Sequence, residues 1–230
     1  MDIDTLFCFH YAGGNASIFK NFLKNSKVKV IAIQLPGREE LINESLLSSL
    51  DEATEYALNI INRYKDKSKF GLLGHSMGTW LAYSVYTKLE VKPSILILSN
   101  FPSPFSLRNS NIWRMNKNLN DIEFQQELKK WDVSELVFQE KYWKVFKNLL
   151  RSDFSLFDNK NNLTKTNIIK DVDVVLIYGT EDKMILSEDI YSWLDIIENN
   201  VFIHPIYGGK HLFTENYFTE WQNIVKKYIL

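Results

Sequence analysis

The chain has 230 residues, of which 45% are hydrophobic and 24% are charged, and this composition predicts one globular domain spanning residues 1–230. Its 27 basic and 28 acidic residues give a formal net charge of −1, which excludes the strongly basic surface of a nucleic-acid-binding protein. The single cysteine, Cys8, excludes an internal disulfide and a cysteine-rich zinc site. No apolar run approaches the roughly 20 residues of a membrane span, and no basic signal-peptide region opens the chain, so we expect a soluble, cytoplasmic protein.

Short β-branched apolar segments alternate along the chain with longer segments of helical period, which is typical of an α/β protein. The short segments are apolar on both faces, as expected of parallel strands covered by helices. The expected strands are Thr5–His10, Val28–Gln34, Lys69–Gly74, Ser94–Ser99, Val172–Tyr178 and Val201–Tyr207. The expected crossover and terminal helices are Leu50–Tyr64, Met77–Leu89, Ser187–Ile197 and Phe213–Ile229.

The interval between Ser99 and Val172 carries no strand pattern. Its periodicity instead predicts a helical insertion over approximately residues 103–165, above the carboxyl edge of the sheet. Ligands of open α/β sheets bind outside that edge, so the insertion is placed to act as a lid, although it could also be a helical subdomain that serves only stability. Its helical segments are expected at Phe124–Trp131 and Ser134–Arg151, after a helix start at Asn120.

The pentapeptide Gly74-His75-Ser76-Met77-Gly78 stands where an expected strand ends and an expected helix begins. A serine on such a sharp turn has its hydroxyl exposed, and glycines on either side let strand and helix approach closely. The N-terminus of the helix favours negative charge at this point. The motif therefore predicts Ser76 as a nucleophile, against the alternative of a glycine-rich turn with a buried serine.

A serine nucleophile needs a histidine base, and the chain has four histidines. His211 follows the last expected strand in a glycine-rich turn, and we predict that it is the base. We expect the ring of His75 to point away from the serine within the turn. His204 lies inside a strand, where a histidine is more often a packed or surface residue, and His10 ends the first strand on the side expected for the oxyanion site.

An acid that orients the histidine should follow a late strand, between serine and histidine in the chain. Asp182 fits this position because it follows the strand Val172–Tyr178. Its neighbour Glu181 is the competitor, whereas Asp173 lies at the opposite end of the strand. The loop after the preceding strand, Ser99-Asn100-Phe101-Pro102, offers no carboxylate. Asp182 is therefore the predicted acid.

Acyl transfer also needs donors for an oxyanion, normally the backbone N–H after the nucleophile and one from a nearby loop. Met77 supplies the first of these groups. The loop after the first strand contains the pair Gly13-Gly14, and there Tyr11 or Ala12 would supply the second, unless the glycines mark a plain strand-to-helix turn. The loop lacks the G-x-G-x-x-G pattern, so dinucleotide binding is not predicted.

Together these motifs resemble those of type II thioesterases of the α/β-hydrolase superfamily, the editing enzymes that accompany nonribosomal peptide synthases (NRPS) and polyketide synthases (PKS). The resemblance covers nearly the whole chain. The matching stretches are Phe7–Gly14 (family F-P-x-A-G-G), Gln34–Glu39 (L-P-G-R), Gly74–Gly78 (G-H-S-M-G), Gly179–Ile185 (G-x-x-D-x-x-V) and Gly209–Phe213 (G-[DG]-H-F-F).

The resemblance implies an α/β-hydrolase fold, a mostly parallel sheet flanked by helices with a helical lid. It also implies that Ser76, His211 and Asp182 hydrolyse acyl or aminoacyl thioesters on the phosphopantetheine arm of carrier proteins, which are transient partners of a monomeric enzyme. Neither a metal nor a bound cofactor is expected. A carboxylesterase, lipase or acyltransferase could use the same three residues, and a non-catalytic binding protein on this scaffold is the alternative from another class.

One expected lid helix carries a basic stripe. Its apolar positions 142, 145, 146, 149 and 150 fall on one helical face. Because carrier proteins are typically acidic, the stripe predicts a docking surface, although a solvated helix face is the simpler explanation. The stripe consists of Lys141, Lys144, Lys147 and Arg151.

The insertion is also rich in aromatic residues. They could wall a channel for a long, thin substrate arm, although most are expected to form the core of the lid. They are Phe101, Phe105, Trp113, Phe124, Trp131, Phe138 and Phe146.

Overall fold

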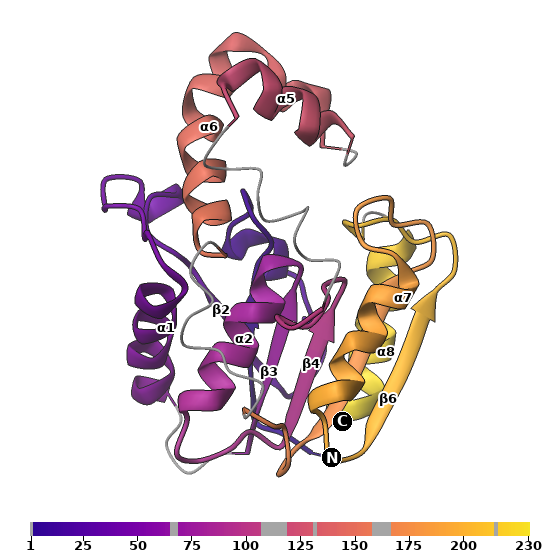
Figure 1. Cartoon of the computed structure of the whole chain (residues 1–230). Helices are drawn as coiled ribbons and strands as arrows, with labels where there is room; N and C mark the ends of the chain where they lie inside the picture. The colour runs from indigo at the N-terminus through magenta and orange to yellow at the C-terminus, as the bar shows by residue number, and fades with distance from the viewer. Residues whose placement is uncertain (1, 65–68, 107–118, 131–132, 158–166, 214–215) are drawn as a thin grey trace.

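The computed structural model describes residues 2–64, 69–106, 119–130, 133–157, 167–213 and 216–230 (Figure 1). Six strands form one parallel sheet in the order β2-β1-β3-β4-β5-β6, so the expected α/β architecture is confirmed. In register, Phe9 of β1 pairs with Ile33 of β2 and with Gly74 of β3. The strands are β1 (Thr5–Phe9), β2 (Lys29–Ile33), β3 (Phe70–His75), β4 (Ile95–Ser99), β5 (Asp173–Gly179) and β6 (Val201–Ile206).

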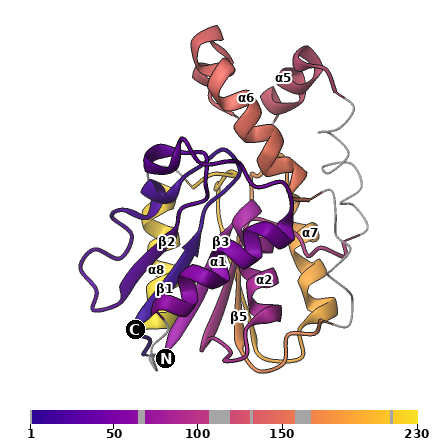
Figure 2. The same ribbon diagram turned by 90° about the vertical axis from the view of Figure 1, so that its left-hand side faces the viewer.

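Helices cover both faces of the sheet, with α1 and α2 on one side and α8 on the other (Figure 2). No helix in the described ranges combines the length and the apolar character that a bilayer crossing requires. The helices that flank the sheet are α1 (Leu50–Tyr64), α2 (Met77–Lys88), α7 (Ser187–Ile190) and α8 (Asn216–Ile229), with short 3₁₀ turns η1 (Ala16–Phe19), η2 (Glu39–Leu41) and η4 (Tyr191–Ile196).

The single helix expected over residues 187–197 is wrong in detail, because four residues of α7 are followed by the 3₁₀ turn η4. Ile190, Trp193 and Ile196 are all buried and are spaced by three residues. Side chains three residues apart align in a 3₁₀ helix, whereas they drift around the axis of an α-helix. The tighter turn therefore buries all three on one face.

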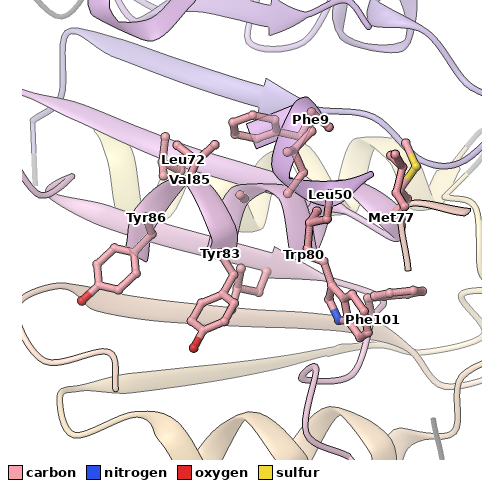
Figure 3. Close-up of a cluster of buried hydrophobic side chains, with 14 of the residues drawn as sticks. Phe9, Leu50, Leu72, Met77, Trp80, Tyr83, Val85, Tyr86 and Phe101 are labelled. Carbon is pink, nitrogen blue, oxygen red and sulfur yellow. The ribbon is translucent and has the colours of Figure 1, made fainter. Parts of the chain in front are cut away.

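Alternating side chains of the central strands enter the two halves of the core. Phe7 and Phe9 of β1 pack on the side of α1 and α2, while Leu6 and Cys8 pack on the side of α8. Figure 3 shows the half of the core on the side of α1 and α2, in which Trp80 of α2 lies beside Phe101. The buried polar atoms of its aromatic residues have partners: Trp80 Nε1 donates to Pro102 O at 2.8 Å and Tyr83 Oη donates to Asn167 O at 2.6 Å.

The two edge strands, β2 and β6, differ from the expectation that every strand is covered on both faces. Most residues of β2 are only partly buried, and Phe202 of β6 is exposed. Edge strands present unpaired backbone groups on one side, and Pro205 in β6 lacks the N–H that would offer a donor there. Apolar composition alone does not tell an edge strand from a central one.

The lid consists of α5 (Asp121–Lys129), η3 (Glu135–Phe138) and α6 (Glu140–Ser155), inserted between β4 and β5. It lies above the carboxyl ends of the strands (Figure 1). The helix start at Asn120 is confirmed, because Asn120 Oδ1 accepts from the backbone N–H groups of Ile122 and Glu123 and the Glu123 carboxylate accepts from Asn120 N. The boundaries near 107–118 and 158–166, together with Trp113 and Trp131, lie outside the described residues.

The lid also corrects two sequence-based expectations. The helix expected to begin at Ser134 begins at Glu140, because the side chain of Ser134 caps the separate turn η3. The apolar face of α6 is rotated: Trp143 is buried, whereas Tyr142 and Val145 are exposed. Trp143 packs against Phe124 of α5, with ring centroids 5.9 Å apart. The neighbouring helix therefore decides which apolar residues of α6 are covered.

Two glycines let α2 begin against the neighbouring strands. A Cβ atom added at Gly74 would lie 2.2 Å from Gly78 O, and one added at Gly78 would lie 2.1 Å from Phe9 O. Both obstacles are backbone atoms of the sheet or of the turn, so a side chain cannot be accommodated without moving the main chain.

We therefore expect Gly78→Ala to lower the free energy of unfolding by about 3 kcal/mol, because the added methyl group meets backbone. Gly71→Ala in the adjoining strand β3 is the matched control. Its new Cβ would meet only side-chain atoms, with the Cγ2 methyl group of Ile95 at 2.8 Å, so no main chain has to move and we expect a smaller loss of about 1 kcal/mol. Urea denaturation followed by fluorescence measures both losses, and equal losses would contradict the backbone argument.

Candidate active site

Ser76 stands at the strand-to-helix turn between β3 and α2, in a backbone conformation that few residues adopt. Its φ is 53° and its ψ is −123°, and its N–H donates to Ser99 O at 2.8 Å. Such a strained position persists only where the surroundings enforce it, here through the close approach of β1, β3 and α2. The turn directs the serine side chain toward the loops at the carboxyl edge of the sheet.

The structure brings the three predicted side chains into one hydrogen-bonded chain. Ser76 Oγ lies 2.7 Å from Nε2 of His211, and Nδ1 of His211 lies 2.7 Å from Oδ2 of Asp182. The Asp182 side chain is almost completely buried, and that of His211 is 11% exposed. The competitor Glu181 is exposed, and the carboxylate that contacts His211 is that of Asp182.

The Asp182 carboxylate is held by the backbone of its own loop. Its Oδ1 accepts from the N–H groups of Met184 and Ile185 at 2.8 and 2.9 Å, which leaves Oδ2 for His211. An ionised carboxylate only accepts, so Nδ1 of His211 carries the proton and Nε2 is the acceptor for the serine hydroxyl. This is the tautomer in which a histidine can take a proton from Ser76.

The other three histidines hydrogen-bond elsewhere. His75 is buried with Nδ1 at 3.1 Å from Ser99 Oγ, and burial lowers its pKa to about 3, assisted by the charge of His211. His10 is also buried, donates from Nδ1 to Tyr11 O at 2.8 Å, and has its pKa lowered to about 4 by burial and then by Arg38. His204 lies 2.5 Å from the hydroxyl of Tyr228. His75 and His10 are consequently neutral at physiological pH.

The predicted oxyanion donors lie around the nucleophile. Met77 is the first residue of α2, so its N–H belongs to the group of helix N-terminal donors that have no partner within the helix. Tyr11 and Ala12 follow β1, and together with Ser76 and Met77 they line one cavity of about 390 Å³. The structure thus places both candidate N–H sources beside Ser76, at the positive end of a helix dipole.

A buried ion pair that the sequence analysis missed joins the lid to Arg38 in the loop after β2, and both of its partners also bind the loop after β1. Arg38 and Asp153 of α6 form two hydrogen bonds, of 2.8 and 3.0 Å, and their side chains are 5% and 2% exposed. Asp153 Oδ2 also accepts from Gly13 N at 2.7 Å, and Arg38 Nη1 donates to Gly14 O at 2.9 Å. The only sequence signal was the position of Arg38 in the L-P-G-R stretch; nothing marked its partner.

The cavity beside Ser76 is walled mainly by apolar side chains from the lid and from the carboxyl edge of the sheet. Among the lining residues that the structure describes, none is Asp, Glu, Lys or Arg. The aromatic lid residues are divided between two roles, because Phe124 is fully buried in the lid whereas Phe101 and Phe146 face the cavity. The remaining apolar lining includes Leu128, Val137, Leu150, Phe154, Phe157 and Met184.

The basic stripe on α6 is partly neutralised by acidic residues. Lys147 and Arg151 both reach Asp121 of α5, at 2.8 and 3.2 Å, and so hold the two lid helices together. Lys144 pairs with Glu140 one turn earlier on the same helix at 2.8 Å. Lys141 lies over the ring of its neighbour Tyr142. Lys141 and Lys144 are the exposed members of the stripe.

The ion pair beneath the lid generates a stability prediction. Asp153→Ala leaves the buried Arg38 guanidinium without its carboxylate, so we expect the free energy of unfolding to fall by about 3–5 kcal/mol. Glu140→Ala is the matched control on the same helix, because its pair with Lys144 is exposed and screened by solvent. Chemical denaturation should show no comparable loss in the free energy of unfolding for the control. A similarly small loss in both variants would contradict the prediction that breaking the buried pair destabilises the fold.

Known proteins of related sequence and structure can be compared with this geometry. The family model described as "Thioesterase domain" matches residues 4–220. The human S-acyl fatty acid synthase thioesterase, medium chain, is 22% identical over 98% of this chain and 85% of its own length. The gramicidin S biosynthesis protein GrsT of Aneurinibacillus migulanus is 27% identical over 90% of this chain and 82% of its own length.

Among solved structures, YbtT, a type II thioesterase from the yersiniabactin NRPS/PKS biosynthetic pathway, superposes with a TM-score of 0.80 at 20% identity. The superposition covers 98% of this chain and 91% of that chain, so the two share the fold over nearly their whole length. The family match spans nearly the entire sequence, and the predicted resemblance is confirmed. The chain belongs to the thioesterase domain family and is a thioester hydrolase of the serine hydrolase type.

Proposed function

We propose that this protein is a cytoplasmic editing thioesterase that removes acyl or aminoacyl groups from the phosphopantetheine arm of carrier proteins in nonribosomal peptide or polyketide synthesis. The observation that carries the proposal is the chain of two 2.7 Å hydrogen bonds through Ser76, His211 and Asp182 at the wall of an apolar cavity under the lid. Relatives named for gramicidin S and yersiniabactin biosynthesis support the carrier-bound substrate.

The first half-reaction transfers the acyl group to the enzyme. Ser76 Oγ attacks the thioester carbonyl carbon while its proton passes to Nε2 of His211, and the buried Asp182 carboxylate stabilises the imidazolium that forms. The negative charge on the carbonyl oxygen is accepted by the N–H of Met77 and that of Tyr11 or Ala12. The C–S bond then breaks, and the His211 proton goes to the departing thiolate sulfur.

The second half-reaction repeats these transfers with water. His211 takes a proton from a water molecule that attacks the acyl-serine carbonyl, and it returns this proton to Ser76 Oγ as the ester bond breaks. The products are a free acid and a carrier with its thiol restored. The proposed chemistry uses only side chains, backbone N–H groups and water, and the phosphopantetheine arrives as part of the substrate. The proposed site lies within one chain, which supports action as a monomer.

The cavity supports a preference among substrates. Its described lining offers no carboxylate to pair with a free α-ammonium group, and burying an unpaired charge is costly. Its volume of about 390 Å³ accommodates a short acyl chain or an aromatic group. Uncharged acyl thioesters are therefore the favoured substrates within the proposed class, ahead of aminoacyl groups.

The function is tested by following an acetyl-loaded carrier protein by intact-mass spectrometry. We expect the wild type to remove the acetyl mass and Ser76→Ala to leave it in place. Asp182→Asn keeps the shape of the acid but loses the charge that stabilises the imidazolium, so we expect turnover to fall roughly 10³–10⁴-fold. An unchanged acetyl carrier, alongside rapid cleavage of a p-nitrophenyl ester, would identify a general esterase instead.

We further propose that the outer face of α6 docks the carrier. Lys141 and Lys144 are exposed on this face, and the adjacent Tyr142 and Val145 are 41% and 60% exposed. An acidic carrier helix with an apolar centre would complement this surface. Its charge would be attracted by the two lysines, and its apolar centre would cover Tyr142 and Val145. Lys147 and Arg151 add positive charge to the same face of α6, and they also pair with Asp121 of α5.

The docking proposal predicts a split in kinetic constants. Lys141→Glu with Lys144→Glu should raise the KM for an acyl carrier roughly tenfold and leave hydrolysis of a small soluble thioester unchanged. These two positions do not bridge the lid helices, so the lid should stay intact. Lys226→Glu with Lys227→Glu on α8 makes the same change in charge away from the lid, and an equal rise in KM with this control would refute a specific docking face.

A further inference from the structure

Asn100 stands immediately after β4, at the loop position where the sequence analysis found no carboxylate. It is 1% exposed, and its φ of 52° lies in the left-handed region. Asparagine tolerates this conformation better than most residues. When it is buried, however, the oxygen and the N–H groups of its carboxamide still need hydrogen-bond partners. The contacts of that carboxamide show what the position does.

The Asn100 side chain connects the loop of the acid with the loop of the base. Its Nδ2 donates to His211 O at 2.8 Å and to Lys210 O at 3.1 Å. Its Oδ1 accepts from Gly179 N at 2.7 Å, at the end of the strand that leads to Asp182. One side chain thus holds the main chain of the histidine itself and the start of the acid loop.

The two loops that Asn100 joins lie in direct backbone contact. A Cβ atom added at Gly179 would lie 2.2 Å from Gly209 O and 2.8 Å from Lys210 O. Glu181 N also donates to Gly209 O at 2.9 Å. The loop that carries His211 is therefore in contact with the end of β5. The two hydrogen bonds donated by Asn100 Nδ2 fix the direction of the carbonyl groups of Lys210 and His211. A movement of this loop would carry His211 away from Ser76.

We propose that Asn100 is a positioning residue for the general base: its carboxamide holds the His211 backbone so that Nε2 stays within hydrogen-bond distance of the Ser76 hydroxyl. This inference rests on the proposed catalytic role of Ser76 and His211. Asn100 touches neither substrate nor reacting atoms and acts only through the backbone of His211. Its loss therefore affects the chemical step more than substrate binding, because the cavity wall does not include it.

Two substitutions separate the donors from the shape and the backbone. Asn100→Asp keeps the size and the acceptor for Gly179 N, but it replaces both donor bonds with carboxylate oxygens facing the carbonyl oxygens of Lys210 and His211. Asn100→Gly keeps the positive φ without strain and removes the side chain. With a butyryl N-acetylcysteamine thioester as substrate, we expect kcat per active site to fall roughly 10–100-fold in both variants, with KM changed less than about twofold.

Active sites are counted by titration with a fluorophosphonate, so that partial unfolding does not lower kcat. Thr54→Val is the matched stability control, because it removes a buried 2.8 Å hydrogen bond to Ser84 on α2 without touching the proposed machinery. This variant should lower the melting temperature and keep wild-type kcat. Wild-type kcat in Asn100→Asp and Asn100→Gly would overturn the inference.

His211→Ala separates the inference from the function on which it rests. If this variant is inactive while both Asn100 variants turn over normally, the proposed triad stands and the positioning role fails. If His211→Ala itself retains wild-type turnover, His211 is not the base, and the triad and the positioning role fail together. Because the substrate is a small thioester, neither outcome depends on carrier docking.

Discussion

The close backbone approach of β1, β3 and the start of α2 is the constraint on which the site depends. Gly74 and Gly78 lack side chains at the two points where a Cβ atom would strike main-chain atoms. This contact forces Ser76 into its strained conformation, and it also brings Met77 N–H and the loop after β1 to the same place. The proposed nucleophile and the proposed oxyanion donors are thus positioned by one packing requirement.

Parallel topology then assembles the rest of the machinery. Every strand of a parallel sheet ends at the same edge, so loops that are distant in the chain converge there. Asp182 follows β5 and His211 follows β6, and both meet Ser76 after β3. Convergence brings these loops near one another, and hydrogen bonds fix their geometry. Two backbone donors bind the Asp182 carboxylate, and the Asn100 carboxamide binds the backbone of His211.

The lid is joined to the same edge by charge as well as by apolar packing. Arg38 and Asp153 are buried beneath it, and each also binds the backbone of the Gly13-Gly14 turn. A buried ion pair of this kind contributes little net stability compared with an apolar contact, but it is specific in geometry. The pair links the C-terminal end of α6 to the loop that carries the proposed oxyanion donors. The upper part of the lid depends on exposed pairs and on aromatic packing instead.

Local patterns in the sequence were sufficient for the strands, for most helices and for selecting Ser76, Asp182 and His211, which the fold joins by hydrogen bonds, because period, turn chemistry and chain order are local or one-dimensional properties. Tertiary structure alone decided which strands lie at the edges, which face of α6 is buried and where η4 tightens. It also decided the partners of Arg38 and Asn100. These features depend on contacts between segments far apart in the chain, and no spacing along a single sequence records which buried polar group will meet which.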